Sequence, residues 1–208
     1  MAQHSADVPP SPARPAIVSA GAWGSTPQPI SPERRHTPNI ITIHHAGETW
    51  EGRRDPADFV RAMQSWGQRD RGWPDLPYHF LIAPDGRIFE GRPLEYEPES
   101  NTDYVLAGHV GVELMGNFEV QRPSEHQLRS CVALVAWLCA SQGISTQAIE
   151  GHCDAAPGQT ACPGRDFYRY IRDGVIRGWV EETIAGASPE VTMLPPLPEG
   201  PTEMIPLD

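Results

Sequence analysis

Two segments far apart in the chain carry the residues that most restrict how it can fold. The stretch 151–164 places His152 and Cys162 ten positions apart, in a loop that proline and glycine keep out of regular structure. Far upstream, the apolar segment 40–45 (IITIHH) ends in two histidines. Imidazole and thiolate are ligands that zinc prefers, and two histidines with one cysteine leave the fourth tetrahedral position open, as in catalytic sites. The sequence therefore predicts a fold that joins this strand end to the loop.

Strand alternation sorts the polar residues near these segments. Neighbouring residues of a strand face opposite sides, so at most one of His44 and His45 can join a given metal, and the pattern does not choose between them. On the strand 110–115, Glu113 points to the side opposite the valines. A cleft on that side would receive its carboxylate.

The overall composition excludes one class of partner. The chain has 208 residues, enough for one domain whose core needs no disulfide staples. Its net charge is −11 and its pI is near 5.1, whereas a face that binds nucleic acid must be basic to neutralise phosphates. We therefore expect no nucleic-acid partner. All sixteen basic residues are arginine, so no lysine can serve as a general base or an oxyanion donor.

The four cysteines do not indicate a disulfide framework. Cys131 and Cys139 lie eight positions apart in a helical pattern. That spacing is about 12 Å along a helix axis, beyond the reach of a disulfide, so both are predicted to be core thiols. If Cys162 binds a metal, Cys153 has no obvious partner. The cysteine count therefore does not assign an oxidising compartment.

Proline-rich segments at both ends suggest tails around one domain. We predict a tail over 1–16, a domain over 17–186 and a second tail over 187–208, and we favour surface-hugging linkers over polyproline docking segments. The chain is expected to be soluble and not inserted in a membrane, because the N-terminus has no apolar run of signal-peptide length and no segment approaches a membrane span. A monomer is also expected. The lack of a signal peptide is compatible with three kinds of protein. They are a cytosolic enzyme, a protein delivered by other machinery, and a chain whose signal has been removed.

Strand and helix patterns alternate between these tails. Asp55 followed by Pro56 predicts a helix start, and Ser124 opens a capping box for a helix that closes near Gly143. A further helix is expected over about 165–184. Strands are expected at 40–45, 78–83, 87–91 and 110–115. The pattern predicts an α/β fold, a single domain with a central mixed β-sheet packed by helices on its faces.

Several motifs occur in the order and spacing of one known family. They are the segments 17–24 (IVSAGAWG), 43–46 (IHHA), 78–82 (YHFLI), 85–92 (DGRIFEGR), 111–118 (GVELMGNF) and the 152–164 loop. Over residues 17 to about 171 the chain resembles zinc-dependent N-acetylmuramoyl-L-alanine amidases of type 2, a group that includes peptidoglycan recognition proteins and amidase-type phage lysozymes. The resemblance implies that family's α/β fold and one zinc ion as cofactor.

The resemblance also assigns site residues. The family's zinc ligands fall on His44, His152 and Cys162. The tyrosine that contacts the active-site water or the oxyanion falls on Tyr78, and the lysine or threonine two positions before the third ligand falls on Thr160. His45 and His79 are not expected to be ligands.

One further match and two departures bear on the kind of amidase. Glu113 matches a catalytic glutamate of cytoplasmic anhydro-muropeptide amidases. Members that bind without cutting typically lack the cysteine ligand, which this chain retains, so the resemblance favours an enzyme. The segment 101–109 replaces the Gly-Ala-His found in many relatives, and Pro93-Leu94 replaces the Gly-Trp of many relatives that prefer diaminopimelate. The stem-peptide preference is therefore not carried over.

Three further residues are candidates for binding substrate. Trp50 and Trp73 could stack on sugar rings, although single aromatics more often belong to the core. His109 could contact substrate, with a hydrogen bond to a loop as the favoured alternative.

The reaction implied by the resemblance is hydrolysis of the amide between N-acetylmuramic acid and L-alanine, with peptidoglycan or muropeptides as partners. Bound zinc lowers the pKa of water towards about 7 and polarises the carbonyl. The hydroxyls of Tyr78 and Thr160 would bond the oxyanion, and Glu113 is the candidate general base if the cleft raises its pKa.

The sequence is compatible with more than one function. Bacteriolytic action at the cell wall, in the periplasm or outside the cell is the first expectation. A cytoplasmic amidase that recycles anhydro-muropeptides, a non-catalytic peptidoglycan-binding module and a hydrolase of some other amide are the alternatives.

Overall fold

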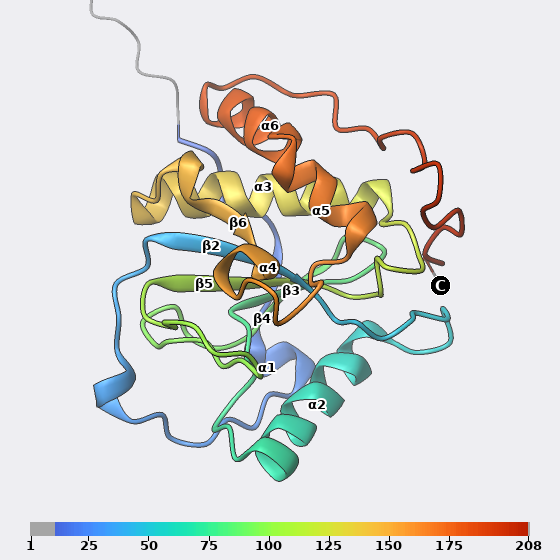
Figure 1. The fold of residues 1–208 in the computed structure, drawn as a ribbon. Coiled ribbons are helices and arrows are strands. Elements are labelled where there is room, and N and C mark those ends of the chain that lie inside the picture. Colours follow the sequence, from blue (N-terminus) through green and yellow to red (C-terminus); the bar gives the residue numbers. More distant parts are fainter. Residues whose placement is uncertain (1–10, 208) are drawn as a thin grey trace, which may run out of the picture.

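The computed structural model describes residues 11–207 and shows a six-stranded mixed sheet between two layers of helices (Figure 1). The predicted N-terminal tail lies partly outside these residues. The strands occur in the order β1-β4-β3-β5-β2-β6, and β3 and β4 are antiparallel while every other neighbouring pair is parallel. Their bounds are Ile17–Val18 (β1), Ile40–His45 (β2), Phe80–Ile82 (β3), Ile88–Glu90 (β4), His109–Leu114 (β5) and Ile149–Gly151 (β6).

Helices cover both faces of the sheet, which confirms the predicted fold class (Figure 1). On one face lie α3 (Glu125–Gln142), α5 (Arg165–Arg172) and α6 (Val175–Ile184), and on the other lie α1 (Ala20–Trp23) and α2 (Pro56–Trp66). The short α4 (His152–Ala155) follows β6 directly. Single turns occupy Pro32–Arg34, Gly67–Arg71 and Thr146–Ala148. No helix of the described residues has the length and apolar character needed to cross a membrane.

The two predicted helix starts are confirmed in detail. The Asp55 side chain accepts a hydrogen bond from the backbone N–H of Ala57 at 2.7 Å, with Pro56 at the first helical position. The Ser124 hydroxyl accepts from the Gln127 N–H at 3.0 Å, and the Gln127 side chain accepts from the Ser124 N–H at 3.2 Å. Cys131 and Cys139 of α3 are buried free thiols, as predicted.

The prediction of one helix over 165–184 is wrong. The first helix, α5, ends at Arg172, and α6 begins after Gly174, whose φ of 73° lies in the left-handed region that glycine adopts without strain. The apolar spacing continues across this break, so periodicity alone did not reveal it. The strands β1 and β6, two and three residues long, were not predicted either.

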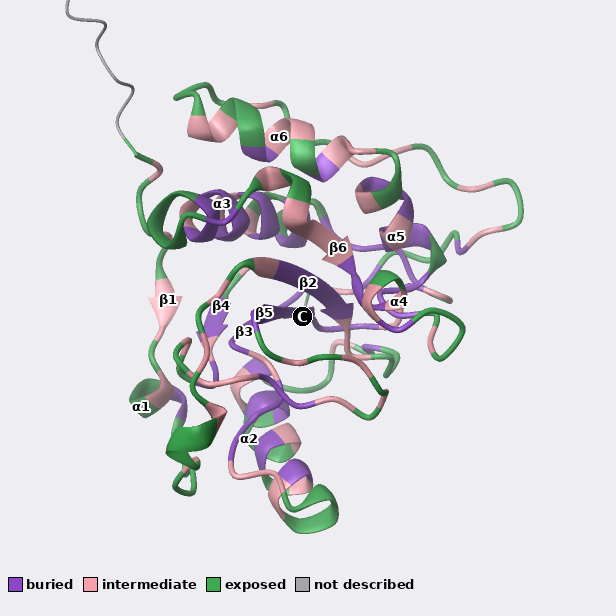
Figure 2. Ribbon diagram, turned by 60° about the vertical axis from the view of Figure 1, so that its left-hand side comes forward, coloured by how far each residue is buried: buried purple, intermediate pink, exposed green. Residues whose placement is uncertain are grey.

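The two faces of the central strands differ in chemistry. Ile41 and Ile43 of β2 are fully buried in the core, and Figure 2 shows β2 and β5 as buried strands. Thr42 and His44 alternate with them, and in the parallel register His44 lies beside Glu113. The polar side chains of both strands therefore share the sheet face on which α2 packs.

The proline-rich C-terminal segment packs against the domain. Val191 and Ile205 are buried, and Ile205 donates its N–H to the carbonyl of Arg122 at 3.0 Å. The buried guanidiniums of Arg122 and Arg169 donate to the carbonyls of Leu194 and Pro195. The C-terminal segment therefore supplies hydrogen-bond acceptors to two buried arginines of the domain.

A buried histidine just before β3 makes the fold sensitive to acid. His79 donates Nε2–H to the Tyr96 carbonyl at 2.9 Å, and its Nδ1 accepts from the Gly111 N–H at 2.9 Å, so the ring must be neutral. Burial lowers the pKa of His79 to about 3, whereas the unfolded chain titrates near 6.5. Below about pH 6.5 the unfolded state binds more protons than the folded state, and stability is lost as the pH falls.

We expect the free energy of unfolding of the zinc-free protein to fall between pH 7 and pH 5. His79 contributes about 1.4 kcal/mol per pH unit below its unfolded pKa, in addition to other buried histidines. Urea unfolding at pH 7, 6 and 5 measures this slope. His79→Gln should reduce the slope, and His126→Gln, which changes an exposed histidine, should leave it unchanged. Equal slopes for the wild type and His79→Gln would contradict the assignment.

Candidate metal centre

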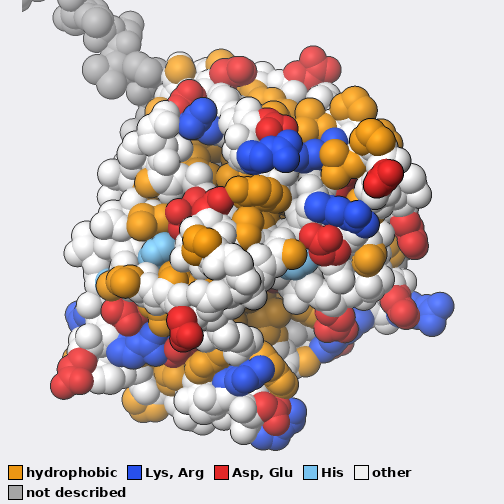
Figure 3. Space-filling view, viewed as in Figure 1, with side chains coloured by type: hydrophobic (Ala, Val, Ile, Leu, Met, Phe, Trp, Pro, Cys, Tyr) orange, Lys and Arg blue, Asp and Glu red, His pale blue; other side chains and the backbone are white. Residues whose placement is uncertain are grey.

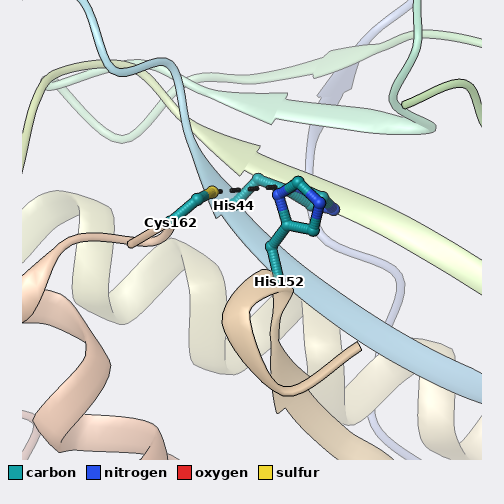
Figure 4. A group of neighbouring side chains, drawn as sticks. All are labelled: His44, His152 and Cys162. Carbon is teal, nitrogen blue, oxygen red and sulfur yellow. Dashed lines mark hydrogen bonds between the residues drawn. The ribbon is translucent and has the colours of Figure 1, made fainter. Parts of the chain in front are cut away.

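Three side chains from three parts of the fold meet at one end of the sheet (Figure 4). His44 lies near the end of β2, His152 is the first residue of α4, and Cys162 lies in the following loop. Cys162 Sγ is 3.7 Å from His44 Nδ1, and the candidate ligand atoms of all three lie within 4.8 Å of one another. A tetrahedral zinc ion places sulfur and nitrogen ligands about 3.5 Å apart. Within residues 11–207 this is the one such cluster of His, Cys, Asp or Glu, and it fits zinc.

The structure resolves which histidine of β2 faces this cluster. His45 points to the opposite side of the sheet, where its Nδ1 accepts from the Phe118 N–H at 3.1 Å. Phe118 stacks in turn on Phe167 of α5, so His45 belongs to the helix layer behind the sheet. The backbone N–H of His45, in contrast to its side chain, points to the cluster and donates to Cys162 Sγ at 3.3 Å. His44 is the candidate ligand, and its neighbour supports the thiol through the backbone.

Burial sets the protonation of the three candidate ligands. Burial, and secondarily His152, lowers the pKa of His44 well below its usual value, and burial lowers the pKa of His152 to about 4. Both imidazoles are therefore neutral at pH 7, the form that coordinates metals. Burial raises the pKa of the Cys162 thiol to about 12. Metal binding must therefore displace a proton from Cys162, which makes the metal affinity pH-dependent.

Tyr78 and Thr160 present hydroxyls beside the cluster, and both line its hollow of about 240 Å³. The Tyr78 ring lies 4.9 Å from the His44 ring and packs against Gly111, where a Cβ would approach the ring to 3.3 Å. Burial raises the pKa of Tyr78, so the phenol keeps its proton and can donate. The Thr160 hydroxyl accepts from the Cys162 N–H at 3.1 Å, which leaves its own proton free to donate.

Glu113 lies on the same sheet face but beneath the hollow. It is fully buried, and neither carboxyl oxygen has a hydrogen-bond partner among residues 11–207. Burial, with a smaller effect from Glu48, raises its pKa well above the usual value, so the carboxyl is protonated at neutral pH in the metal-free protein. An unpaired buried carboxyl is costly, which singles this residue out as a functional candidate.

The three candidate substrate-binding residues lie in different surroundings. Trp73 is half-buried and lines the hollow at the ligands. Trp50 is buried edge-on against Phe59 and lines a neighbouring hollow instead. His109 is buried, and its Nδ1 shares a hydrogen bond with the Thr42 hydroxyl at 2.7 Å. Only Trp73 of the three lines the ligand hollow.

A groove of about 430 Å³, lined by both aromatic and polar side chains, continues from the ligand hollow along α2. The two share residues including Trp73 and Tyr78, and Figure 3 shows hydrophobic side chains around a recess on this face. Phe59, Met63 and Trp66 of α2 line the groove. These side chains lie one helical turn apart along α2, so one stripe of the helix faces the groove.

Comparisons with known proteins agree with this geometry. A family model described as N-acetylmuramoyl-L-alanine amidase (Amidase_2) matches residues 34–165. Peptidoglycan recognition protein 1 of Bos taurus is 31% identical over 163 residues, which cover 75% of this chain and 82% of that protein. A protein of Sus scrofa named N-acetylmuramoyl-L-alanine amidase is 30% identical over 167 residues, which cover 76% of this chain and 27% of that protein.

Solved structures of amidases and peptidoglycan recognition proteins are also similar to this chain. The endolysin amidase LysCS from Clostridium intestinale URNW is 27% identical with a TM-score of 0.61, covering 78% of this chain and 98% of that one. Wild-type PGRP-LB from Drosophila is 26% identical with a TM-score of 0.64, covering 75% and 92%. The chain therefore belongs to the Amidase_2 family, which groups N-acetylmuramoyl-L-alanine amidases with peptidoglycan recognition proteins.

Proposed function

We propose that this protein is a zinc-dependent amidase that cleaves the bond between N-acetylmuramic acid and L-alanine in peptidoglycan. The observation that carries this proposal is the complete donor set of His44, His152 and Cys162, gathered within 4.8 Å in a hollow that opens into a groove with aromatic walls. A closed structural zinc site uses four protein ligands, whereas three ligands beside a hollow leave room for substrate. Membership of the Amidase_2 family supports peptidoglycan as the substrate class.

The side chains around the hollow suit amide hydrolysis. A zinc ion held by the three ligands would supply positive charge to polarise the amide carbonyl and would make water a better nucleophile. The Tyr78 phenol and the Thr160 hydroxyl each have a proton to donate to the oxygen on which negative charge develops. The groove along α2 would hold the rest of the substrate by burying it against aromatic side chains.

Glu113 is the candidate general base, but it can act as a base only if its buried carboxyl is ionised. A base must be ionised, and burial disfavours the ionised form. A nearby divalent cation opposes that effect, because an opposite charge favours the carboxylate. Glu113 is therefore expected to ionise when the metal is bound and to move a proton between the attacking water and the leaving amine.

Glu113 also supports a second candidate substrate. A glutamate at this position is the feature by which the chain resembles cytoplasmic amidases that act on soluble anhydro-muropeptides. Intact sacculi and soluble anhydro-muropeptides should therefore be offered side by side. The faster substrate decides between wall degradation and recycling.

Mass spectrometry of muropeptides after incubation with the zinc-loaded protein tests the proposal. We expect free stem peptide that begins with L-alanine, together with glycan that has lost it. A protein that binds zinc and retains peptidoglycan without releasing any stem peptide would instead be a binding module.

A further inference from the structure

One ring nitrogen of His152 is contacted by two hydroxyl groups from a single loop. Thr102 Oγ1 lies 2.6 Å from His152 Nε2, and Ser100 Oγ lies 3.4 Å from the same atom. The two hydroxyl oxygens are 2.9 Å apart, and Ser100 Oγ also accepts the backbone N–H of Thr102 at 3.1 Å. The hydroxyls of Ser100 and Thr102 therefore form a connected pair that ends on His152.

The loop that carries this pair is fixed on both sides. Before it, the buried Glu99 carboxylate pairs with Arg34 and with Arg92, the latter at 3.1 Å. After it, the Gln159 side chain donates to the Asp103 carbonyl at 2.9 Å and accepts from the Asp103 N–H at 2.8 Å. Gln159 belongs to the same loop as Cys162. Through Asp103 and Gln159, the loop that carries the hydroxyl pair is hydrogen-bonded to the loop that supplies the thiol ligand.

The contact between Thr102 Oγ1 and His152 Nε2 determines which ring nitrogen of His152 can bind a metal. A neutral imidazole has one N–H and one lone pair, on different nitrogens. Each ring nitrogen points in a single in-plane direction, and an oxygen at 2.6 Å from Nε2 leaves no space there for a metal at about 2.0 Å. The ligand atom must therefore be Nδ1, and Nε2 must carry the proton.

We propose that Thr102 is a positioning residue: its hydroxyl accepts a hydrogen bond from Nε2–H of His152, donates one to Ser100 Oγ, and so turns the lone pair of Nδ1 towards the zinc. The proposal rests on the zinc site of the proposed function. A partner on the second nitrogen of a histidine ligand fixes the tautomer and the ring orientation and makes the ligand more basic.

The expected effect is on zinc affinity. Thr102→Val keeps the shape of the side chain and removes the acceptor, and loss of such a partner typically weakens metal binding about 10- to 100-fold. Thr102→Ser retains a hydroxyl and should bind zinc close to the wild-type affinity. Because Ser100 is the next acceptor within reach, the double variant Ser100→Ala/Thr102→Val should bind more weakly than Thr102→Val alone.

Competition with a chelator of known zinc affinity, applied to the full chain, gives these values. Thr146→Val is the matched control, because it removes a threonine hydroxyl that bonds Glu181 on α6, and it should leave the affinity unchanged. Unchanged zinc affinity in both Thr102→Val and the double variant would overturn the proposal.

A spectroscopic readout on the wild type needs no variant. Nitrogen-15 NMR of the imidazole rings in the zinc-loaded protein should show His152 with a protonated Nε2 and a metal-bound Nδ1. A metal-bound Nε2 would overturn the proposal whatever the activity. Failure of the proposed function is seen separately, as a zinc-loaded wild type that releases no stem peptide.

Discussion

Cys162→Ser is expected to abolish stoichiometric zinc binding and the release of stem peptide together. Cys162 supplies the only anionic ligand of the three, and a serine hydroxyl is a poor replacement for a thiolate. Loss of the ion removes several kcal/mol of transition-state stabilisation, which corresponds to a fall of about 1000-fold or more in kcat/KM. Zinc content by elemental analysis and stem-peptide release by mass spectrometry should fall in parallel.

The same loop offers a matched control. Cys153 is a half-buried free thiol that is not part of the cluster, so Cys153→Ser should keep both zinc and activity. Zinc-free samples of the two variants should unfold at similar urea concentrations, because neither serine disturbs the apolar core. A Cys162→Ser protein that carries one zinc per chain and releases peptide at the wild-type rate would refute the three-ligand site.

Glu113→Gln is expected to lower kcat by about 100- to 10,000-fold while zinc binding is retained, since this is the usual contribution of a general acid or base. The two side chains have nearly the same shape. In the metal-free protein burial keeps the Glu113 carboxyl protonated, so the neutral amide replaces a neutral acid. At neutral pH the wild type must bind a proton at Glu113 in order to fold, because this carboxyl is ionised in the unfolded chain, whereas glutamine needs no proton. The free energy of unfolding of the zinc-free variant at pH 7 should therefore be no lower than that of the wild type, and the loss should appear in kcat.

Single-turnover rates and zinc content, measured on the same preparations, separate these effects. Glu125→Gln changes an exposed carboxylate on α3 and should leave both unchanged. The acidic limb of the wild-type pH profile, which reports the ionisation of the base, should be absent from the residual activity of Glu113→Gln. Full activity in Glu113→Gln would leave Glu113 as a buried strand residue with no part in the chemistry.

The sequence predicts the local features of this protein well because each has a local cause. Side-chain caps at Asp55 and Ser124 mark helix starts, and alternation along β2 requires that His44 and His45 diverge. The resemblance selected His44, and the structure explains why: the His44 side chain lies within the cluster with His152 and Cys162, whereas the His45 ring accepts the N–H of Phe118.

Features that depend on distant packing could not be predicted. The hydroxyls of Ser100 and Thr102 lie in a polar stretch without periodicity, and only the fold brings them to His152. The burial of Glu113 depends on neighbouring strands on both sides. The break at Gly174 interrupts an apolar pattern that would suit one continuous helix, so a single glycine was not a sufficient signal.

The path of the C-terminal segment bears on how the protein should be labelled or immobilised. After its contacts with Arg122 and Arg169 the chain ends beside the loop that precedes α2, and Leu207 lines a hollow with Arg53 and Arg54 (Figure 1). Arg54 also lines the groove. A bulky reporter attached there would sit at the outer mouth of the groove and obstruct access to it.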